Sequence, residues 1–275
     1  MAVQERRRIV CRIAVVTVLA MAVSAAAAAQ FNRVSRSRLA RPADFDGMFH
    51  FCRLVYDSAP SADRGGSWQT DWPNADINMS IRLSELTKTR VSFTGSSPNP
   101  LLVQPSDDQL FQCPMVIMTA PGSAFFGEDD AARLREFLTK GGFLWADDSW
   151  GSLQWEQWES QITKVLPPPD FEIVDLPMGH PLLRTQFIVT EIPQIPNIGY
   201  FRRSGGDTSE RGADSAIPVA RMIADASGRI LVLMTHNTDI SDSWEREGED
   251  ASYFYAFSPR GYALGINVFL YAMTH

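Results

Sequence analysis

The sequence is poor in the residues that build zinc centres, and it has no excess of positive charge. It holds 3 Cys and 4 His, and no CxxC or Cys/His spacing typical of zinc ligands occurs. Lys and Arg number 25 against 32 Asp and Glu, a net charge of -7. An acidic chain lacks the electrostatic attraction that drives binding to nucleic acid or to anionic membrane surfaces. We therefore expect no nucleic-acid partner. The Cys and His content and spacing indicate no metal ligand, and no cofactor is assigned.

Long apolar runs are also missing. The run at residues 13–29 is shorter than the roughly 20 apolar residues that a transmembrane helix needs. It follows Arg6, Arg7, Arg8 and Arg12 and ends in small residues, which is the pattern of a secretory signal peptide. We expect cleavage after residue 29 and a periplasmic or secreted mature protein without a membrane span; an uncleaved anchor is the alternative. Without the four Arg and one Glu of residues 1–29, 21 basic and 31 acidic residues remain, a net charge of -10.

The rest of the chain suits one domain with a short leader. Residues 30–46 have scattered Arg, Ser and Pro without an apolar period, so we expect a flexible leader there and a single domain at 47–275. Cys52 and Cys113 remain after cleavage. An exported protein permits them to pair, but cysteine is among the most buried residue types, so we favour two buried, unpaired thiols.

One stretch organises the fold prediction. Residues 128–139 predict a helix with acidic residues in its first turn, and the glycines at 141–142 end it. The apolar residues 143–146 then predict a buried strand that leads directly into Asp147 and Asp148. Similar patterns predict strands at 48–55, 91–94, 115–119, 171–174 and 187–190, a hairpin of 219–224 with 229–235, and helices at 76–88, 153–164 and 259–273. We predict an α/β fold with a mostly parallel sheet.

Acidic and aromatic residues follow several of these elements. Ligands of open α/β sheets bind outside the carboxyl ends of the strands, so we expect three such loops to meet at one edge. Carboxylates and amides bind hydroxyl-rich ligands, and Trp offers a flat face to a sugar ring. The candidate ligand-binding residues are Asp71, Trp72, Asp76, Asp147, Asp148, Trp150, Asn237, Asp239 and Trp244. Asp147 and Asp148 are also the candidate catalytic residues.

Asp147 and Asp148 cannot point the same way, because strand side chains alternate. One is expected to face the site and the other to anchor a neighbouring loop. Asn237, Asp239 and Asp242 could add oxygen ligands for a divalent cation, but their spacing matches no EF-hand loop.

The strings FCRLVYDS, PMVIMTAPG, GGFLWADDSWG, HNTDISDSWE and GINVFLYAMTH resemble the bacterial family catalogued as domain of unknown function 4159, over about residues 49–275. That family is similar in fold to class I glutamine amidotransferases, which implies a flavodoxin-like three-layer sandwich and no established activity. Those enzymes need a Cys nucleophile at a turn after a strand, where this chain has Asp148 and Ser149. Similar families carry an aromatic residue at Ser149. We therefore expect neither glutaminase activity nor a serine nucleophile.

These observations favour an exported protein of the cell envelope that binds a small molecule, a glycan or a protein partner without catalysis. The alternative is a hydrolase acting on an envelope glycan, with Asp147 or Asp148 as general acid or base. A raised pKa on one of that pair inside a cleft is needed for the hydrolase and is not needed for simple binding. A scaffold role is a third possibility, which an exposed apolar patch would indicate.

Overall fold

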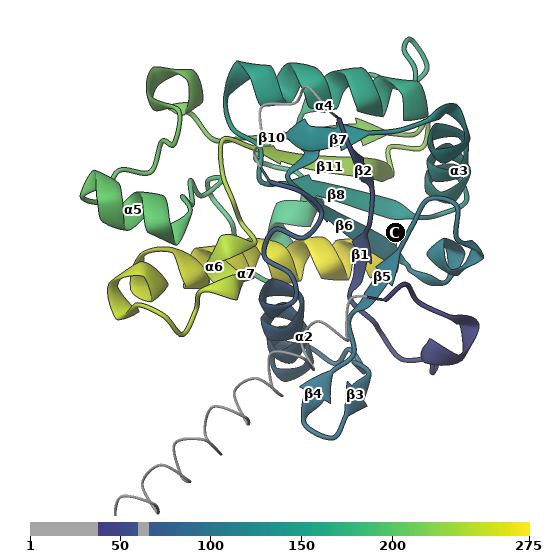
Figure 1. Cartoon of the computed structure of the whole chain (residues 1–275), viewed down its shortest axis with the longest axis horizontal. Helices are drawn as coiled ribbons and strands as arrows, with labels where there is room; N and C mark the ends of the chain where they lie inside the picture. The colour runs from purple at the N-terminus through teal and green to yellow at the C-terminus, as the bar shows by residue number, and fades with distance from the viewer. Residues whose placement is uncertain (1–37, 60–65) are drawn as a thin grey trace, which may run out of the picture. The chain divides into compact units, whose positions relative to one another are not determined.

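The computed structural model describes residues 38–59 and 66–275, so the signal peptide predicted at residues 1–29 lies outside the described residues. The chain divides into a unit Met1–Leu39 and a unit Ala40–His275, and the second contains the sheet and the helices discussed below (Figure 1). No helix in the described part of the chain combines the length and apolar character needed to cross a membrane.

A seven-stranded, mostly parallel sheet forms the centre of this unit. Its strands, in spatial order, are β5 (Leu101–Val103), β1 (Cys52–Leu54), β6 (Met115–Thr119), β8 (Phe143–Asp147), β11 (Ile230–His236), β10 (Val219–Ala224) and β9 (Val174–Asp175). The strands from β5 to β11 are parallel, whereas β10 and β9 are antiparallel to their neighbours. Numbered by their place in the chain, the parallel strands are arranged 2-1-3-4-5. The direction of winding therefore reverses between β1 and β6, which is where open sheets form binding sites.

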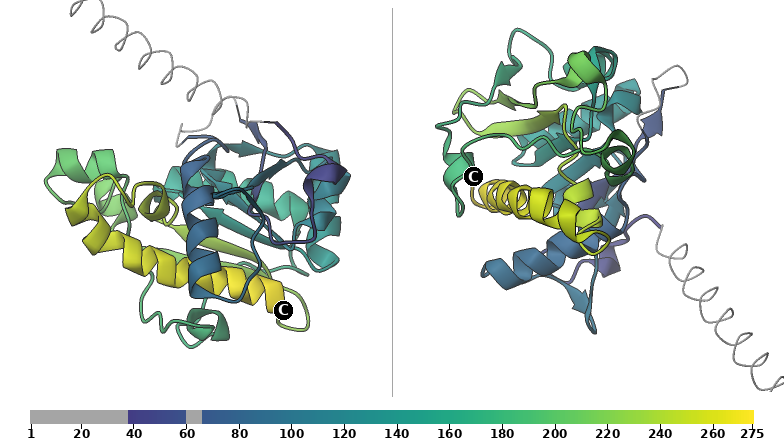
Figure 2. Two further views of the ribbon diagram at one scale, coloured as in Figure 1. Left: turned by 90° about the horizontal axis from the view of Figure 1, so that it is seen from below. Right: turned by 90° about the vertical axis from the view of Figure 1, so that its left-hand side faces the viewer.

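Helices cover both faces of the sheet (Figures 1 and 2). The helices are α2 (Asn74–Leu86), α3 (Glu128–Thr139), α4 (Gly151–Val165), α5 (Ile198–Ser204), α6 (Asp242–Glu245) and α7 (Ala251–Thr274). Alternate strand residues enter two cores: Phe143 and Trp145 pack with residues of α2, α6 and α7, and Leu144 and Ala146 with residues of α3 and α4. The domain is therefore a three-layer α/β arrangement.

Shorter elements join these layers. Outside the sheet lie the two-stranded ribbons β2 (Asp57–Ser58) with β7 (Ala124–Phe125) and β3 (Phe93–Thr94) with β4 (Ser97–Pro98), and the 3-10 turns η1 (Pro42–Asp44), η2 (Asp108–Gln112), η3 (Pro121–Ser123), η4 (Pro181–Arg184) and η5 (Gly212–Ser215). Of the leader expected at residues 30–46, only 38–46 are described. There the Ala40 amide donates to the Leu102 carbonyl, and the Asp46 carboxylate accepts from Ser92.

Most helices and central strands of the prediction are confirmed, but several segments differ. The strands predicted at 91–94 and 171–174 are observed only as β3 at Phe93–Thr94, outside the central sheet, and as β9 at Val174–Asp175. The strand β5 was missed because it is only three residues long and lies in a Pro-rich region. The strand predicted at residues 187–190 is wrong, because the Asn267 side chain bonds the backbone of Gln186 and Phe187 in place of a neighbouring strand. The last helix begins at Ala251 rather than Pro259, since the Asp250 side chain caps it by accepting from Ser252 and Tyr253.

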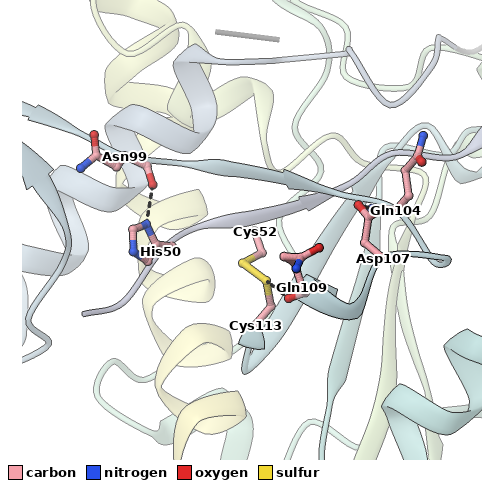
Figure 3. The surroundings of a disulfide bond; sticks show 7 residues. All are labelled: His50, Cys52, Asn99, Gln104, Asp107, Gln109 and Cys113. Carbon is pink, nitrogen blue, oxygen red and sulfur yellow. Dashed lines mark hydrogen bonds between the residues drawn. A yellow bond between two sulfur atoms is a disulfide. The ribbon is translucent and has the colours of Figure 1, made fainter. Parts of the chain in front are cut away.

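The expectation of two unpaired thiols is also wrong. Cys52 and Cys113 form a disulfide, with their Cα atoms 6.1 Å apart (Figure 3). Cys52 begins β1, and Cys113 lies just before β6, the next strand in the sheet. The bond therefore joins the two strands between which the winding reverses.

Candidate functional site

Polar side chains replace apolar ones at the carboxyl ends of the parallel strands. On the face covered by α2 and α7, the alternation that places Phe51, Ile117 and Trp145 in the core continues into Arg53, Thr119 and Asp147. These three side chains are fully buried, at 0% exposure. Buried polar groups must find partners, so their contacts show which of them support the fold and which are available to a ligand.

Arg53 and Asp76 form a buried ion pair. The Arg53 Nε atom lies 3.0 Å from Asp76 Oδ1 and 3.1 Å from Oδ2, and Nη1 donates to Thr119 Oγ1 and to the carbonyls of Trp68 and Thr70. Burial raises the pKa of the Asp76 carboxyl, and the Arg53 charge opposes that rise. Asp76 thus holds the Arg53 guanidinium in place, and Arg53 in turn binds the backbone of residues 68–70. Arg53 escaped sequence analysis because it stands alone inside an apolar run.

Asp147 anchors the loop between β11 and α6. Its carboxylate accepts from Thr235 Oγ1 at 2.6 Å, from Ser241 Oγ at 2.8 Å, and from the backbone amides of Ser241 and Ile240 at 2.9 and 3.3 Å. Burial raises the pKa of the Asp147 carboxyl, and these donors act against that rise. With four donors on one carboxylate, Asp147 performs the loop-anchoring role expected of one member of the acidic pair.

Asp148 differs from its neighbour. It has a left-handed backbone, with φ 64°, and its Oδ1 accepts from the indole of Trp150 at 3.0 Å. Burial raises the pKa of Asp148 well above its usual range, and the negative charges of Asp147, Glu210 and Asp242 add to the effect. A buried carboxyl with one hydrogen-bond donor among the described residues and several acidic neighbours favours the protonated form, or a cation beside it.

Three further candidates lie at the same edge but support the fold. Asn237 accepts from the Gly151 amide at 2.9 Å and donates to the Ile217 carbonyl at 2.9 Å, so both ends of its amide are occupied. Trp244 is fully buried and packs against Trp145. Trp72 is half-buried, with the Arg53 guanidinium 6.0 Å from its ring centroid.

Asp71 and Asp239 belong to an acidic cluster that also includes Asp242 and Glu245. Each of Asp71 and Asp239 has a pKa raised well above its usual value, first by burial and then by the charges of cluster members and of Asp148. Burial also raises the pKa of Glu245, to about 7. Within the described part of the chain, Asp71 Oδ2 is buried without a hydrogen-bond partner. Asp242 was considered from the sequence only as a further oxygen ligand for a cation, and neither Asp242 nor Glu245 was selected for the site.

Two neighbouring strands end in left-handed turns, and the left-handed residue of each carries neither a thiol nor a hydroxyl. Ala120 follows β6 with φ 50° and ψ 49°, and Asp148 follows β8. Tyr56 donates its hydroxyl to the carbonyls of Thr119 and Ala120 and so secures the first turn. Non-glycine residues in this conformation cost free energy, and such turns concentrate at functional sites. Here neither left-handed residue presents a thiol or a hydroxyl.

The carboxylates lie apart from a surface pocket of about 500 Å³ between β7, α3 and α4. That pocket is lined by residues that include Phe125, Arg135 and Lys164, and by none of the candidate site residues. Its basic side chains make it a second place where a ligand could bind.

The sequence matches one family model over residues 50–273, which includes every residue of the acidic edge. The chain belongs to the DUF4159 family, described as a domain of unknown function. No curated protein matches the sequence. The DUF4159 match thus establishes the relationship expected from the sequence motifs, and its name assigns no activity.

Proposed function

We propose that this protein binds a ligand or partner in the cell envelope through the acidic carboxyl edge of its sheet, without catalysis. The observation that carries this proposal is the gathering of the buried residues Asp71, Asp148 and Asp239, whose pKa values are raised first by burial and then by the charges of neighbouring carboxylates. Carboxyls in this state cost free energy in the isolated protein. A ligand that donates hydrogen bonds or carries positive charge offsets that cost, which favours hydroxyl-rich or cationic molecules.

The fold supports a binding role. The arrangement 2-1-3-4-5 of the parallel strands is the flavodoxin-like order, which class I glutamine amidotransferases resemble, and its ligands bind where the winding reverses. An amidotransferase also needs a nucleophile at a strand-end turn, where this chain has Ala120 and Asp148. Its two described cysteines are joined in a disulfide. Glutamine hydrolysis is therefore not part of the proposal.

Export to the periplasm or the exterior is part of the proposal. The basic and apolar pattern of residues 1–29 supports it. The disulfide between Cys52 and Cys113 supports it independently, because disulfides persist in oxidising compartments and are rare in the cytosol.

A hydrolase acting on an envelope glycan is the second candidate. The raised pKa of Asp148 favours it, since a general acid must hold its proton near the working pH. Asp147 is less suited to this role because four hydrogen-bond donors already occupy its carboxylate oxygens.

A ligand screen with Asp148→Asn separates the candidates. Glycan fragments and small polyols are tested by thermal shift and calorimetry, and release of reducing ends is followed in the same samples. The binding proposal expects a saturable shift that is lost in Asp148→Asn and kept in the surface variant Asp108→Asn, whose side chain is 92% exposed. Turnover lost in Asp148→Asn would support the hydrolase instead. A shift kept in Asp148→Asn but lost in Arg135→Gln would place the ligand in the α3–α4 pocket and overturn the proposal.

A further inference from the structure

Three carboxylates from two separate segments converge at the acidic edge. Asp71 comes from the connection between β1 and α2, and Asp242 and Glu245 lie one turn apart on α6. One oxygen atom from each lies within 4.8 Å of the others. Like charges repel at this distance, so the arrangement requires protons or a positive charge among the three side chains.

Two of these side chains have a carboxylate oxygen that accepts no hydrogen bond from the described residues. Asp71 is 7% exposed and Asp242 is 0% exposed, and neither Asp71 Oδ2 nor Asp242 Oδ1 has a hydrogen-bond donor among residues 38–59 and 66–275. The other oxygen of Asp242 accepts from the Ile198 amide at 2.9 Å and from the Tyr253 hydroxyl at 2.8 Å. These donors fix the Asp242 carboxylate and leave Oδ1 directed away from them.

Nearby arginines supply only part of the compensating charge. Arg53 is committed to Asp76 and to the backbone of residues 68–70. Arg246 Nε lies 2.7 Å from Glu245 Oε2 and 3.5 Å from Asp242 Oδ1, but the guanidinium also pairs with Glu249 and is partly exposed. Arg246 therefore contacts two of the three carboxylates, and the charge of Arg53 opposes the pKa rise of Asp71 and Glu245, while Asp148 and Asp239 add further negative charge nearby.

We propose that Asp71, Asp242 and Glu245 bind a hard divalent cation, Ca²⁺ or Mg²⁺. Oxygen ligands alone are the set that these ions prefer, and carboxylates from two segments can complete part of a shell whose other positions hold water. The proposal deepens the proposed function, because a bound cation would neutralise the acidic edge at which the ligand is expected. It also differs from the cation site suggested by the sequence, since Asn237 has both ends of its amide engaged.

The test measures cation binding by the purified protein alone. After treatment with EDTA and its removal, CaCl₂ and MgCl₂ are titrated by calorimetry, and Tm is followed at an ionic strength kept constant with NaCl. One of the two ions is expected to bind with one site per chain and to raise Tm by about 5 °C or more at one hundred times Kd. NaCl alone is expected to give no saturable shift.

Conservative variants identify the site. Asp71→Asn and Glu245→Gln each remove a ligand charge, so they are expected to weaken cation binding at least tenfold while leaving the cation-free Tm unchanged or higher, because a repulsion is removed. Glu247→Gln is the matched control on the same segment; its carboxylate pairs with Arg82, so cation binding should persist. No saturable binding of either ion, or binding retained in both Asp71→Asn and Glu245→Gln, would overturn the proposal.

The organic-ligand screen, repeated with EDTA and with the cation, separates this proposal from the function on which it rests. A ligand that binds equally in EDTA and depends on Asp148 would leave the proposed function intact and argue against a cation beside it. Cation binding without any organic ligand at the acidic edge would support the cation site and count against the ligand role.

Discussion

Replacing Arg53 with Met tests how the acidic edge is held in place. The substitution removes a buried guanidinium that donates to Asp76, to Thr119 and to the carbonyls of Trp68 and Thr70. Removing one partner of a buried ion pair costs about 3–5 kcal/mol, because the other charge stays buried without compensation. We expect a loss of about 4 kcal/mol, which with a urea m-value of about 2.5 kcal/mol/M lowers the unfolding midpoint by roughly 1.5 M.

Urea unfolding followed by circular dichroism measures this loss. Two results distinguish the loss of this ion pair from a loss of packing. Burial already raises the pKa of Asp76 in the wild type, and loss of the Arg53 charge raises it further, so the stability lost relative to wild type should shrink as pH falls through the higher folded-state pKa of the variant toward that of the wild type. Adding Asp76→Asn should recover part of the loss, because the uncompensated charge is gone. The control Arg133→Met removes a partly exposed guanidinium and should cost under about 1 kcal/mol. A cost below about 1 kcal/mol for Arg53→Met, or no dependence on pH, would refute the reasoning.

Three further predictions concern other parts of the fold. Removing the bond between Cys52 and Cys113 by the double Ala substitution should cost about 4 kcal/mol on the chain-entropy model, since the bond closes a separation of 61 residues; a thiol count on denatured protein should find no reactive thiol from this pair before reduction. Burial lowers the pKa of His236, so the neutral ring stabilises the fold above the unfolded pKa near 6.5, and this stability is lost as pH falls. The difference in unfolding free energy between the wild type and His236→Gln should therefore narrow between pH 7 and pH 5. Asp147→Asn places an amide against the donors of Ser241 and should cost about 1–3 kcal/mol, with faster hydrogen exchange at the Ser241 amide.

Periodicity predicted most of the fold because the sheet obeys simple burial rules. The strand β6 was predicted with the bounds that it has, since residues 115–118 are apolar and Pro121 follows shortly after Thr119. The segments that differed are governed by side chains far away in the sequence. Asn267 bonds the backbone of Phe187 across 80 residues, and no local pattern near residue 187 reveals it.

The gathering of acidic residues at one edge of the sheet was predicted, but the role of each residue was not. Acidic residues after strands predicted this edge because parallel strands all deliver their carboxyl ends to one side of the sheet. Sequence could not separate Asp147, which has four hydrogen-bond donors, from Asp148, which has one donor among the described residues and a left-handed backbone. It also could not pair Asp71 with Asp242 and Glu245, which lie more than 170 residues farther along the chain.

Unfavourable local features of this domain are concentrated at one edge. The non-glycine residues with positive φ in the described ranges are Asp71, Ala120, Asp148 and Asn237, and each lies in a segment that follows the carboxyl end of a parallel strand. The strongly raised carboxyl pKa values belong to the same segments. Strained backbone and uncompensated charge each cost free energy, and the disulfide, the Arg53 pair and the Asp147 anchor all stabilise the elements beside them. The concentration of these features at the carboxyl edge of the sheet supports the proposal that this edge receives a positively charged or hydrogen-bond-donating partner.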